Sequence, residues 1–406
     1  EKATEKRQLF LSNLDLVLVS YHQSVAFFNS PENGVSFSNI CDTFLHALRL
    51  LLVPYDFLAG RLNLNDGGKY EIDCNNSGVI VAIAKTTSKM SDLGDLETPN
   101  SNFSKLVSFL NDEDESKKDV QTLPLLLFQL TQFGCGSLAL ASKYNHCALD
   151  GMAVREFEQN LAALTRGEDL VKVPNSDRSI YKARSPPIIS FPHFEYTTEP
   201  YDIPKIEAED HSYKVSLMQI LGLKKIIMKE GTLKYCSTFQ AIAAKIWKAR
   251  TVATEIDGEA TVTMLFPVNV REIVVPPAPP GFAGNALVAG FAQAKAKEIK
   301  EATLGTIVKM IQEGMKRMTD EYVKSSVDWL EANKGMVRLE NSFSLVSWFK
   351  LGLEDENFSW GKCVAAVPIT SSPSLVFLLP IEGGLIISLQ LPSDQAQDFF
   401  KCLYQV

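Results

Sequence analysis

The sequence predicts an α+β protein that has two domains of similar size and mixed β-sheets. Its 406 residues exceed the length of one ordinary domain. Strand-like and helix-like segments follow one another without the strict alternation that is typical of a parallel sheet. Prolines between residues 173 and 209 exclude helix interiors and central strands, and they are Pro174, Pro186, Pro187, Pro192, Pro200 and Pro204. We therefore expect a first domain at residues 1–172, an extended crossover at 173–212 and a second domain at 213–406.

The first half contains both kinds of element. Ser38 is expected to cap a helix that carries Ile40, Phe44 and Leu51 on one face and ends before Pro54. Apolar and β-branched residues between turn signals predict four strands, at residues 70–73, 78–84, 123–131 and 136–144. The charged run at 112–118 is expected to be a solvated loop.

The second half resumes after the proline-rich crossover. Residues 237–250 and 394–404 are expected to be helices, and 292–332 to hold one or two long polar helices. Strands are expected at 260–267, 343–350, 364–368, 374–379 and 384–391.

Composition excludes several classes of protein. The net charge of −8 and the lack of a long Lys or Arg run argue against a nucleic-acid surface. The seven cysteines are scattered and never spaced as C-x-x-C, which predicts reduced thiols in the cytoplasm and no zinc framework. No pair of histidines has metal-ligand spacing with an acid, so we expect no metal. No signal peptide and no apolar run of membrane-spanning length is visible.

His146 is the main candidate for a catalytic residue. A predicted strand leads into it, and a predicted helix follows Asp150, whose carboxylate suits a helix N-terminus. A neutral imidazole in such a turn can accept a proton at pH 7. Five histidines and 48 acidic residues predict roughly 0.6 His-x-x-x-acid pairs by chance. On this pattern alone, a histidine satisfied by its backbone neighbours is an equal alternative.

Further segments give the pattern more weight. His146 to Gly151 reads H-x-x-x-D-G, and Asn357 to Gly361 reads N-F-S-W-G. Together with Ser12–Asp15, residues 52–62, Phe282–Asn285 and Glu382–Gly384, they resemble the plant BAHD acyltransferases over nearly the whole chain. Ser12–Asp15 is similar to the opening strand of that family. The resemblance implies two pseudo-symmetric domains of the chloramphenicol acetyltransferase type, with acyl-CoA as co-substrate and no permanently bound cofactor.

The resemblance also implies roles for single residues. His146 would be the general base, taking a proton from the acceptor and passing it to the leaving thiolate. Asp150 would be a structural brace paired with Arg271, with direct chemistry as the less favoured alternative. Trp348 would donate its indole N–H to the thioester carbonyl, a core tryptophan being the equal alternative.

The second signature departs from the D-F-G-W-G pattern of the family. Asn357 replaces the usual Asp, and Ser359 replaces the first Gly. Phe358, Trp360 and Gly361 match, and the five residues together would shape a loop. A positive φ at position 359 would disfavour the serine.

Coenzyme A would bind to one helix of the second half. Ser237 and Thr238 stand at its N-terminus, where free N–H groups favour a phosphate. Lys234, Lys245 and Lys248 are candidate cations, each with a solvated lysine as the alternative.

The function implied is O-acyl transfer from a hydroxycinnamoyl-type CoA thioester to an alcohol, by a cytoplasmic monomer. Residues 177–187 resemble a run common in hydroxycinnamoyl transferases. Val346 stands where the shikimate type has a Thr, which favours a less polar acceptor. Two alternatives remain, an N-acyltransferase acting on an aliphatic amine and an inactive family member acting as a partner protein.

Overall fold

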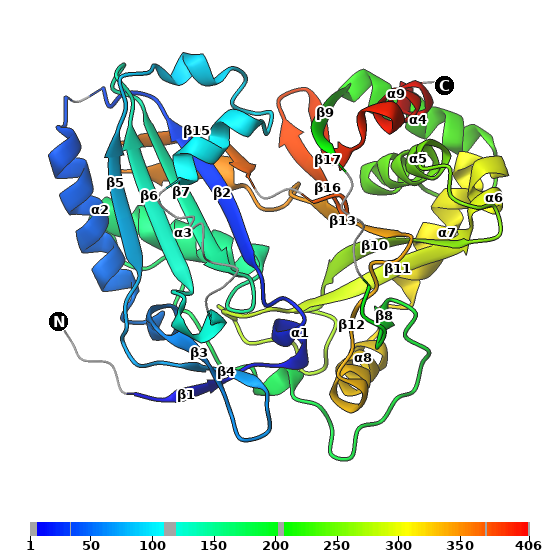
Figure 1. Ribbon diagram of the computed structural model, residues 1–406, viewed down its shortest axis with the longest axis horizontal. Coiled ribbons are helices and arrows are strands. Elements are labelled where there is room, and N and C mark those ends of the chain that lie inside the picture. Colours follow the sequence, from blue (N-terminus) through cyan, green and yellow to red (C-terminus); the bar gives the residue numbers. More distant parts are fainter. Residues whose placement is uncertain (1–5, 33, 109–118, 202–206, 370–371, 405–406) are drawn as a thin grey trace. The chain divides into compact units, whose positions relative to one another are not determined.

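The structure is a computed structural model that describes residues 6–32, 34–108, 119–201, 207–369 and 372–404. The chain forms two compact units (Figure 1). The first comprises Glu1–Ala183, Pro277–Ala286 and Leu351–Thr370, and the second comprises Arg184–Pro276, Leu287–Lys350 and Ser371–Val406. This differs from a linear division at residues 172 and 212, because two later segments pack into the first unit. The loop expected at 112–118 lies outside the described residues.

A six-stranded sheet lies at the centre of the first unit, in the order β14-β15-β2-β7-β6-β5. Its strands are β2 (Tyr21–Phe28), β5 (Ile80–Lys85), β6 (Leu126–Gln132), β7 (Leu138–Asn145), β14 (Asn357–Phe358) and β15 (Gly361–Pro368). Only β5 and β6 pair in parallel. A smaller sheet joins β1 (Gln8–Phe10), β4 (Tyr70–Asp73) and β3 (Arg61–Leu64) in the order β1-β4-β3. The four strands predicted in the first half are confirmed, with ends shifted by up to three residues.

The helices of this unit are α1 (Asn13–Leu16), α2 (Phe37–Leu51) and α3 (Gly151–Thr165). The α2 helix begins two residues earlier than predicted, because the Ser36 hydroxyl accepts a hydrogen bond from the Asn39 N–H at 3.2 Å. The strand expected at Ser12–Asp15 was wrong. Ser12 and Asp15 form a capping box instead, in which each side chain binds the other's backbone N–H, and this starts α1.

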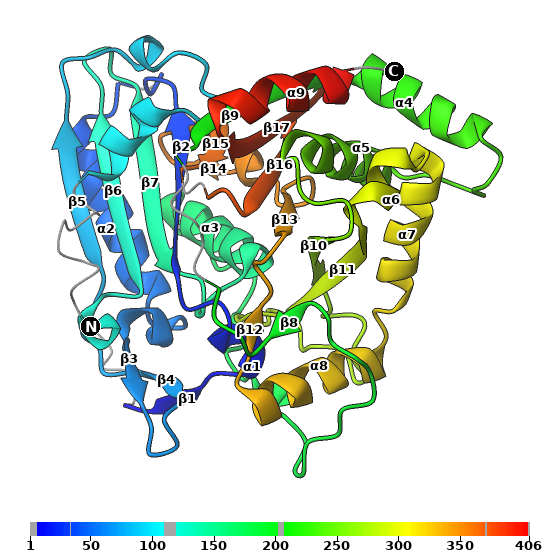
Figure 2. The ribbon, with the colours of Figure 1, turned by 45° about the vertical axis from the view of Figure 1, so that its right-hand side comes forward.

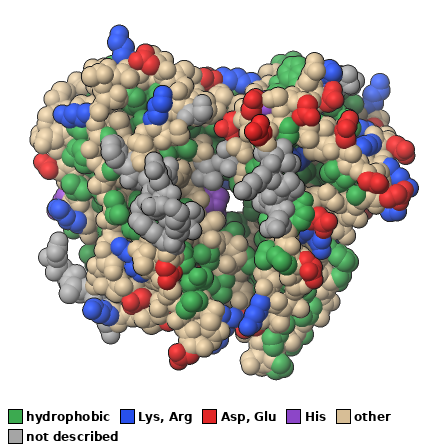
Figure 3. Space-filling view, in the orientation of Figure 1, with side chains coloured by type: hydrophobic (Ala, Val, Ile, Leu, Met, Phe, Trp, Pro, Cys, Tyr) green, Lys and Arg blue, Asp and Glu red, His purple; other side chains and the backbone are tan. Residues whose placement is uncertain are grey.

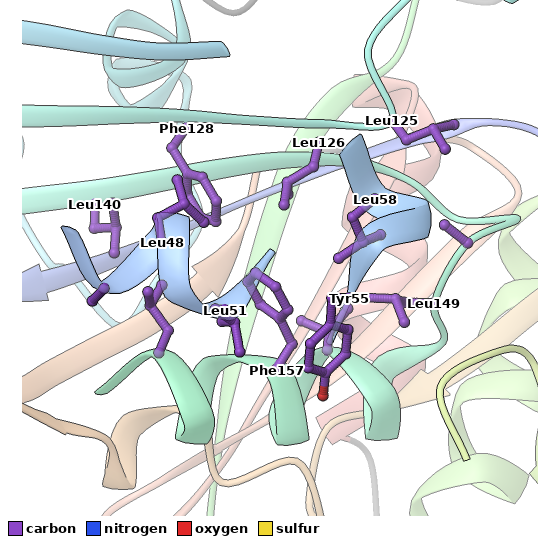
Figure 4. Packing of buried hydrophobic residues seen from close by; sticks show 14 of the residues in the cluster. Leu48, Leu51, Tyr55, Leu58, Leu125, Leu126, Phe128, Leu140, Leu149 and Phe157 are labelled. Carbon is purple, nitrogen blue, oxygen red and sulfur yellow. The ribbon is translucent and has the colours of Figure 1, made fainter. Parts of the chain in front are cut away.

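The core of the first unit lies between the sheet and two helices. Figure 4 shows Leu51 of α2 and Phe157 of α3 on one side of the strands, with Leu126, Phe128 and Leu140 pointing toward them. Because side chains alternate along a strand, the even-numbered residues of β6 and β7 face these helices. The candidate site begins at the C-terminal end of β7, directly after Asn145.

The second unit has its own six-stranded mixed sheet, in the order β11-β10-β13-β16-β17-β9. Its strands are β9 (Glu209–Ser216), β10 (Thr261–Asn269), β11 (Leu287–Lys295), β13 (Ser342–Ser347), β16 (Leu375–Ile381) and β17 (Gly384–Leu391). The β10–β13 and β13–β16 pairs are parallel. Two short strands, β8 (Tyr196–Thr197) and β12 (Met336–Val337), pair separately.

Six helices belong to the second unit in its described part. They are α4 (Leu217–Lys229), α5 (Thr238–Ala253), α6 (Ala296–Glu301), α7 (Leu304–Lys316), α8 (Asp320–Asn333) and α9 (Ser393–Tyr404). Figure 2 shows α5 and α9 side by side, and both contribute to one buried apolar cluster. The helices expected near 237–250 and 394–404 are confirmed. The helical region expected at 292–332 begins as strand β11 and then divides into three helices.

The surface bears mixed charge. On the face in Figure 3, Lys and Arg side chains of the described residues are interspersed with Asp and Glu, without a continuous basic patch. No helix in the described ranges is long and apolar enough to cross a membrane. Within the same ranges, no cluster of three His, Cys, Asp or Glu side chains could hold a metal ion.

Candidate active site

His146 lies in the turn between β7 and α3, as the sequence predicts. Asp150 caps α3, and its Oδ1 accepts a hydrogen bond from the Ala153 N–H at 3.0 Å. The backbone N–H of His146 donates to the Ser20 carbonyl at 2.8 Å. The turn is therefore held at both ends, and it presents a half-buried imidazole.

Asn285 determines which nitrogen of His146 carries the proton. The Asn285 Nδ2 donates to Asp15 Oδ1 at 2.9 Å and to the His146 carbonyl at 2.8 Å. Both partners can only accept, so the orientation of the amide is fixed. Its Oδ1 then faces His146 Nδ1 at 3.1 Å and requires a proton there. The lone pair of a neutral His146 is consequently on Nε2, where it can take a proton from another molecule.

The buried carboxylate of Asp15 holds Asn285 in this orientation. Its Oδ2 accepts hydrogen bonds from the Ser12 N–H at 2.8 Å and the Ser12 hydroxyl at 2.7 Å. Its Oδ1 also accepts the Asn285 backbone N–H at 3.0 Å. The Arg178 Nε lies 3.4 Å from Asp15 Oδ2, and both side chains are 0% exposed. Arg178 donates to the Ala148 carbonyl at 2.8 Å and so ties this buried ion pair to the turn that holds His146.

The imidazole is kept neutral by its surroundings. Burial lowers the pKa of His146, while its backbone hydrogen bond, Asp150, Asn285 and Asp15 oppose that shift. The ring of His22 packs edge-on against His146, with ring centroids 4.8 Å apart. Burial, aided by His146, lowers the pKa of His22 to about 3, so this second ring is also neutral at pH 7.

Asp150 braces its own unit through two backbone contacts. Besides Ala153, the fully buried carboxylate accepts a hydrogen bond from the Ala286 N–H at 3.0 Å through Oδ2. Arg271 follows β10 in the second unit, and its guanidinium donates to Asn269 Oδ1 at 3.3 Å. The pairing of Asp150 with Arg271 stays a prediction.

Trp348 and the candidate coenzyme helix belong to the second unit. Trp348 directly follows β13, its backbone N–H donates to the Leu378 carbonyl at 2.9 Å, and its indole packs edge-on against Phe377 at 6.1 Å. Ser237 caps α5, with Thr238 as the first helical residue, and its hydroxyl accepts the Gln240 N–H at 3.1 Å.

The three candidate lysines differ in their surroundings. Lys234 is exposed, and Lys245 is half-buried with a pKa lowered by burial. The Lys248 ammonium donates to the Ala302 carbonyl at 2.5 Å. The role of these residues toward coenzyme A stays a prediction.

The N-F-S-W-G segment lies in the first unit. Phe358 and Trp360 stack at 4.7 Å and pack edge-on against Phe28, so both are core residues. Gly361, with φ +142°, has the unusual backbone conformation, and residue 359 does not. Ser359 is therefore unstrained, and its N–H donates to the side chain of a threonine in α3 at 3.1 Å. Asn357 is exposed, and its carbonyl accepts a hydrogen bond from an arginine.

Sequence reasoning assigned no role to three members of the His146 network. Asp15, Arg178 and Asn285 each stand inside a family-like segment, but their contacts span up to 270 residues of chain. The Ser-x-x-Asp spacing of Ser12 and Asp15 is a capping-box signal that could have predicted the helix. It could not have predicted the partners of Asp15.

The comparisons with known proteins agree with this fold. A model of the Transferase family matches residues 1–405. Acyltransferase GLAUCE from Arabidopsis thaliana is 34% identical over 98% of this chain and 92% of that protein. A hydroxycinnamoyltransferase from Narcissus pseudonarcissus is 30% identical over 99% of this chain and 96% of that protein.

Solved structures share the fold at lower identity. Vinorine synthase has a TM-score of 0.78 at 20% identity, covering 98% of this chain and 92% of that chain. F. graminearum TRI101, complexed with coenzyme A and T-2 mycotoxin, has a TM-score of 0.76 at 19% identity, covering 97% and 96%. The α+β fold of two mixed-sheet units is thus that of known acyltransferases. With the family match over the whole length, the chain belongs to the Transferase family, the BAHD acyltransferases, and is an acyltransferase.

Proposed function

We propose that this acyltransferase moves a hydroxycinnamoyl-type acyl group from coenzyme A to the hydroxyl of an alcohol, with His146 as general base. The observation that carries the proposal is the fixed amide of Asn285, which leaves the lone pair of His146 on Nε2. The acyl group is suggested by relatives named hydroxycinnamoyltransferase and omega-hydroxypalmitate O-feruloyl transferase.

The reaction needs one proton to move twice. The Nε2 of His146 removes the hydroxyl proton as the acceptor oxygen attacks the thioester carbonyl carbon. The resulting tetrahedral oxyanion collapses, the C–S bond breaks, and His146 returns the proton to the coenzyme A thiolate. The products are an ester and free coenzyme A, so atoms and charge balance. The other proton stays on Nδ1 throughout, hydrogen-bonded to Asn285 Oδ1, and this bond keeps the ring oriented.

Two further groups complete the proposal from the second unit. Trp348 would donate its indole N–H to the oxyanion, because a preorganised donor at that position lowers the barrier to acyl transfer. The N-terminus of α5 at Ser237 and Thr238 would meet a coenzyme A phosphate, with Lys234, Lys245 and Lys248 as nearby cations.

Replacing the proposed base tests the mechanism. His146→Ala should lower kcat by at least ~10²-fold, the usual worth of a general base. The melting temperature should stay close to that of the unaltered protein, since Asp150 still caps α3. The exposed His46→Ala serves as the control on α2. Undiminished product formation by folded His146→Ala would remove His146 from the mechanism.

The main alternative is transfer to an amine. A relative from Avena sativa, 28% identical over 99% of this chain, is named a 5-hydroxyanthranilate N-hydroxycinnamoyltransferase. The same base serves an amine nucleophile. A screen that crosses several acyl-CoAs with pooled alcohols and amines, read by product mass, separates the two reactions.

A catalytically inactive partner protein is the remaining alternative, raised by Asn357 and Ser359. Release of free coenzyme A with any acceptor would exclude it. We also propose a cytoplasmic monomer, which size-exclusion chromatography and a fluorescent fusion would test.

A further inference from the structure

The second unit holds a cavity of about 170 Å³ beside the C-terminal half of α5, at the ends where β10 and β13 begin. Part of its wall is apolar and includes Ile256, Leu339 and Phe343. Among the described residues that line it, Arg250 is the only charged one. An apolar cavity of about 150 Å³ is large enough to hold one benzene ring. This cavity therefore has room for a single aromatic ring next to a cation.

One face of α5 forms the polar part of the wall. It contributes four side chains at the spacings of one helix face, and they are Trp247, Arg250, Thr251 and Thr254. The hydroxyl of Thr251 donates to the Trp247 carbonyl at 2.8 Å, and that of Thr254 donates to the Arg250 carbonyl at 2.9 Å. Two buried N–H groups of this face, Trp247 Nε1 and Arg250 Nη1, have no hydrogen-bond partner in the described part of the chain.

Arg250 has no counter-charge among the described residues. Its Nη2 donates to the Pro373 carbonyl at 2.6 Å, and its guanidinium lies over the ring of Phe343 at 5.2 Å. Neither partner is ionised, and no described Asp or Glu lines the cavity. Burial lowers the pKa of Arg250 to about 10, so the guanidinium keeps its charge at pH 7. A cation with little access to water and no anion nearby is costly, and an anionic ligand in the cavity would offset that cost.

The cavity lies away from the groups of the second unit that are proposed to act in acyl transfer. Arg250 follows Thr238 by about three helical turns, which is about 18 Å along α5. Phe343 stands near the start of β13 and Trp348 directly after its end, roughly 16 Å apart along an extended chain. A ligand in the cavity would therefore occupy a place of its own.

We propose that this cavity is a binding site for an aromatic monocarboxylic acid with one ring. The carboxylate would accept hydrogen bonds from Arg250 and Trp247, and the ring would lie in the apolar part beside Leu339. Two N–H groups suit the two oxygens of one carboxylate. A phosphate would need further donors, and the threonine hydroxyls of α5 already bind carbonyl groups. Arg250 Nη1 is covered by its neighbours, and a rotation of the flexible side chain, which is common on binding, brings it to the cavity.

Calorimetric titration with benzoate tests the site, and benzamide serves as a neutral probe of the same shape. Near pH 7 benzoate is ionised, and it should bind at least ~10-fold more tightly than benzamide. Arg250→Met removes the charge at similar side-chain length and should weaken benzoate binding by at least ~30-fold. Arg49→Met, which replaces an exposed arginine of α2 in the first unit, should leave benzoate binding unchanged.

A second variant tests the cavity without removing the cation. Leu339→Trp places a large ring in the cavity and should weaken benzoate binding by at least ~10-fold. Because Leu339 is partly exposed, this variant also decides the matter if Arg250→Met does not fold, as its melting temperature would show. Tryptophan emission gives an independent readout. Benzoate should change the emission of the unaltered protein but not that of Trp247→Phe, which keeps the other three tryptophans.

Several results would overturn the site. They are no binding of benzoate at millimolar concentration, equal binding of benzamide, and benzoate binding that persists in Arg250→Met or Leu339→Trp. Tighter binding of inorganic phosphate than of benzoate, lost in Arg250→Met, would reject the aromatic acid as the ligand. His146→Ala should bind benzoate as the unaltered protein does, and a loss of binding there would assign benzoate to the active site instead.

Discussion

Replacement of Asn285 by alanine would separate the orientation of His146 from its presence. The substitution removes the acceptor of the Nδ1 proton at 3.1 Å and both Nδ2 hydrogen bonds, to Asp15 and to the His146 carbonyl. The imidazole stays in place through its backbone bond to Ser20. What is lost is the requirement that Nδ1 carry the proton.

The structure sets the size of the effect. One hydrogen bond to a neutral ring contributes about 1 kcal/mol, and admission of the wrong tautomer adds to this loss. We expect kcat/KM to fall by about 10- to 100-fold, which is ~1.4–2.8 kcal/mol of barrier. The lost bond to the Asp15 carboxylate should also lower stability by about 1.5–3 kcal/mol, although the Ser12 bonds to Asp15 remain.

Two measurements check this reasoning. Steady-state kinetics of Asn285→Ala is compared with the exposed Asn39→Ala, which should behave like the unaltered enzyme. Nitrogen NMR of the unaltered protein should find His146 neutral at pH 7 with its proton on Nδ1. A proton on Nε2, or full activity in Asn285→Ala, would refute the role of Asn285.

The remaining predictions concern charge and packing. Because burial lowers the pKa of His146, the imidazole stays neutral below pH 6.5, and kcat/KM should not decrease until the pH is lowered below that value. A decrease in kcat/KM with a midpoint at pH 6.5 or higher would contradict this. Arg178→Met leaves the buried Asp15 charge uncompensated and should destabilise the protein by about 3–5 kcal/mol in urea unfolding, a loss under 1 kcal/mol counting against the ion pair. Burial raises the pKa of Glu158 from 4.5 to about 8 in the folded protein, so the contribution of the protonated carboxyl to stability is lost as the pH rises through this window. Glu158→Gln should therefore melt at the same temperature as the unaltered protein at pH 4 and at a higher temperature at pH 9, with a gain of at most about 5 kcal/mol in the free energy of unfolding. A difference that does not depend on pH would contradict this. Gly60→Ala places a Cβ 2.4 Å from the Asp73 carbonyl and should destabilise by about 1–3 kcal/mol, which an unchanged melting temperature would disprove.

Local signals in the sequence were sufficient for the surroundings of His146. Apolar strand residues, a turn and an N-capping Asp150 each act within a few residues, so β7 and α3 could be predicted from the chain alone. The general fold followed from the resemblance, which the family match confirms.

Elements that depend on distant partners could not be predicted in the same way. The segment that forms β11 is rich in alanine, which favours helix. It is a strand because nine consecutive residues pair with β10. Tertiary pairing outweighs local preference here.

The candidate site has the same limit. Its histidine could be found from a motif, but the contacts that fix its proton join distant parts of the chain. The His146–Asn285 contact spans 139 residues, and the Asp15–Asn285 contact spans 270. Nothing in the spacing of Asn285 indicates that its amide lies between a carboxylate and an imidazole. Only the folded first unit brings the three together.

The position of β15 in the first sheet has a consequence for synthesis of the protein. Strand β2 pairs with β7 on one side and with β15 on the other, and its Phe28 is opposite Cys363. A nascent chain therefore makes β2 early and must wait for more than three hundred further residues before that edge is covered. At about 5–20 residues per second this takes tens of seconds. During this time the exposed edge of β2 is open to pairing with other chains, which makes it a natural place for a chaperone to act.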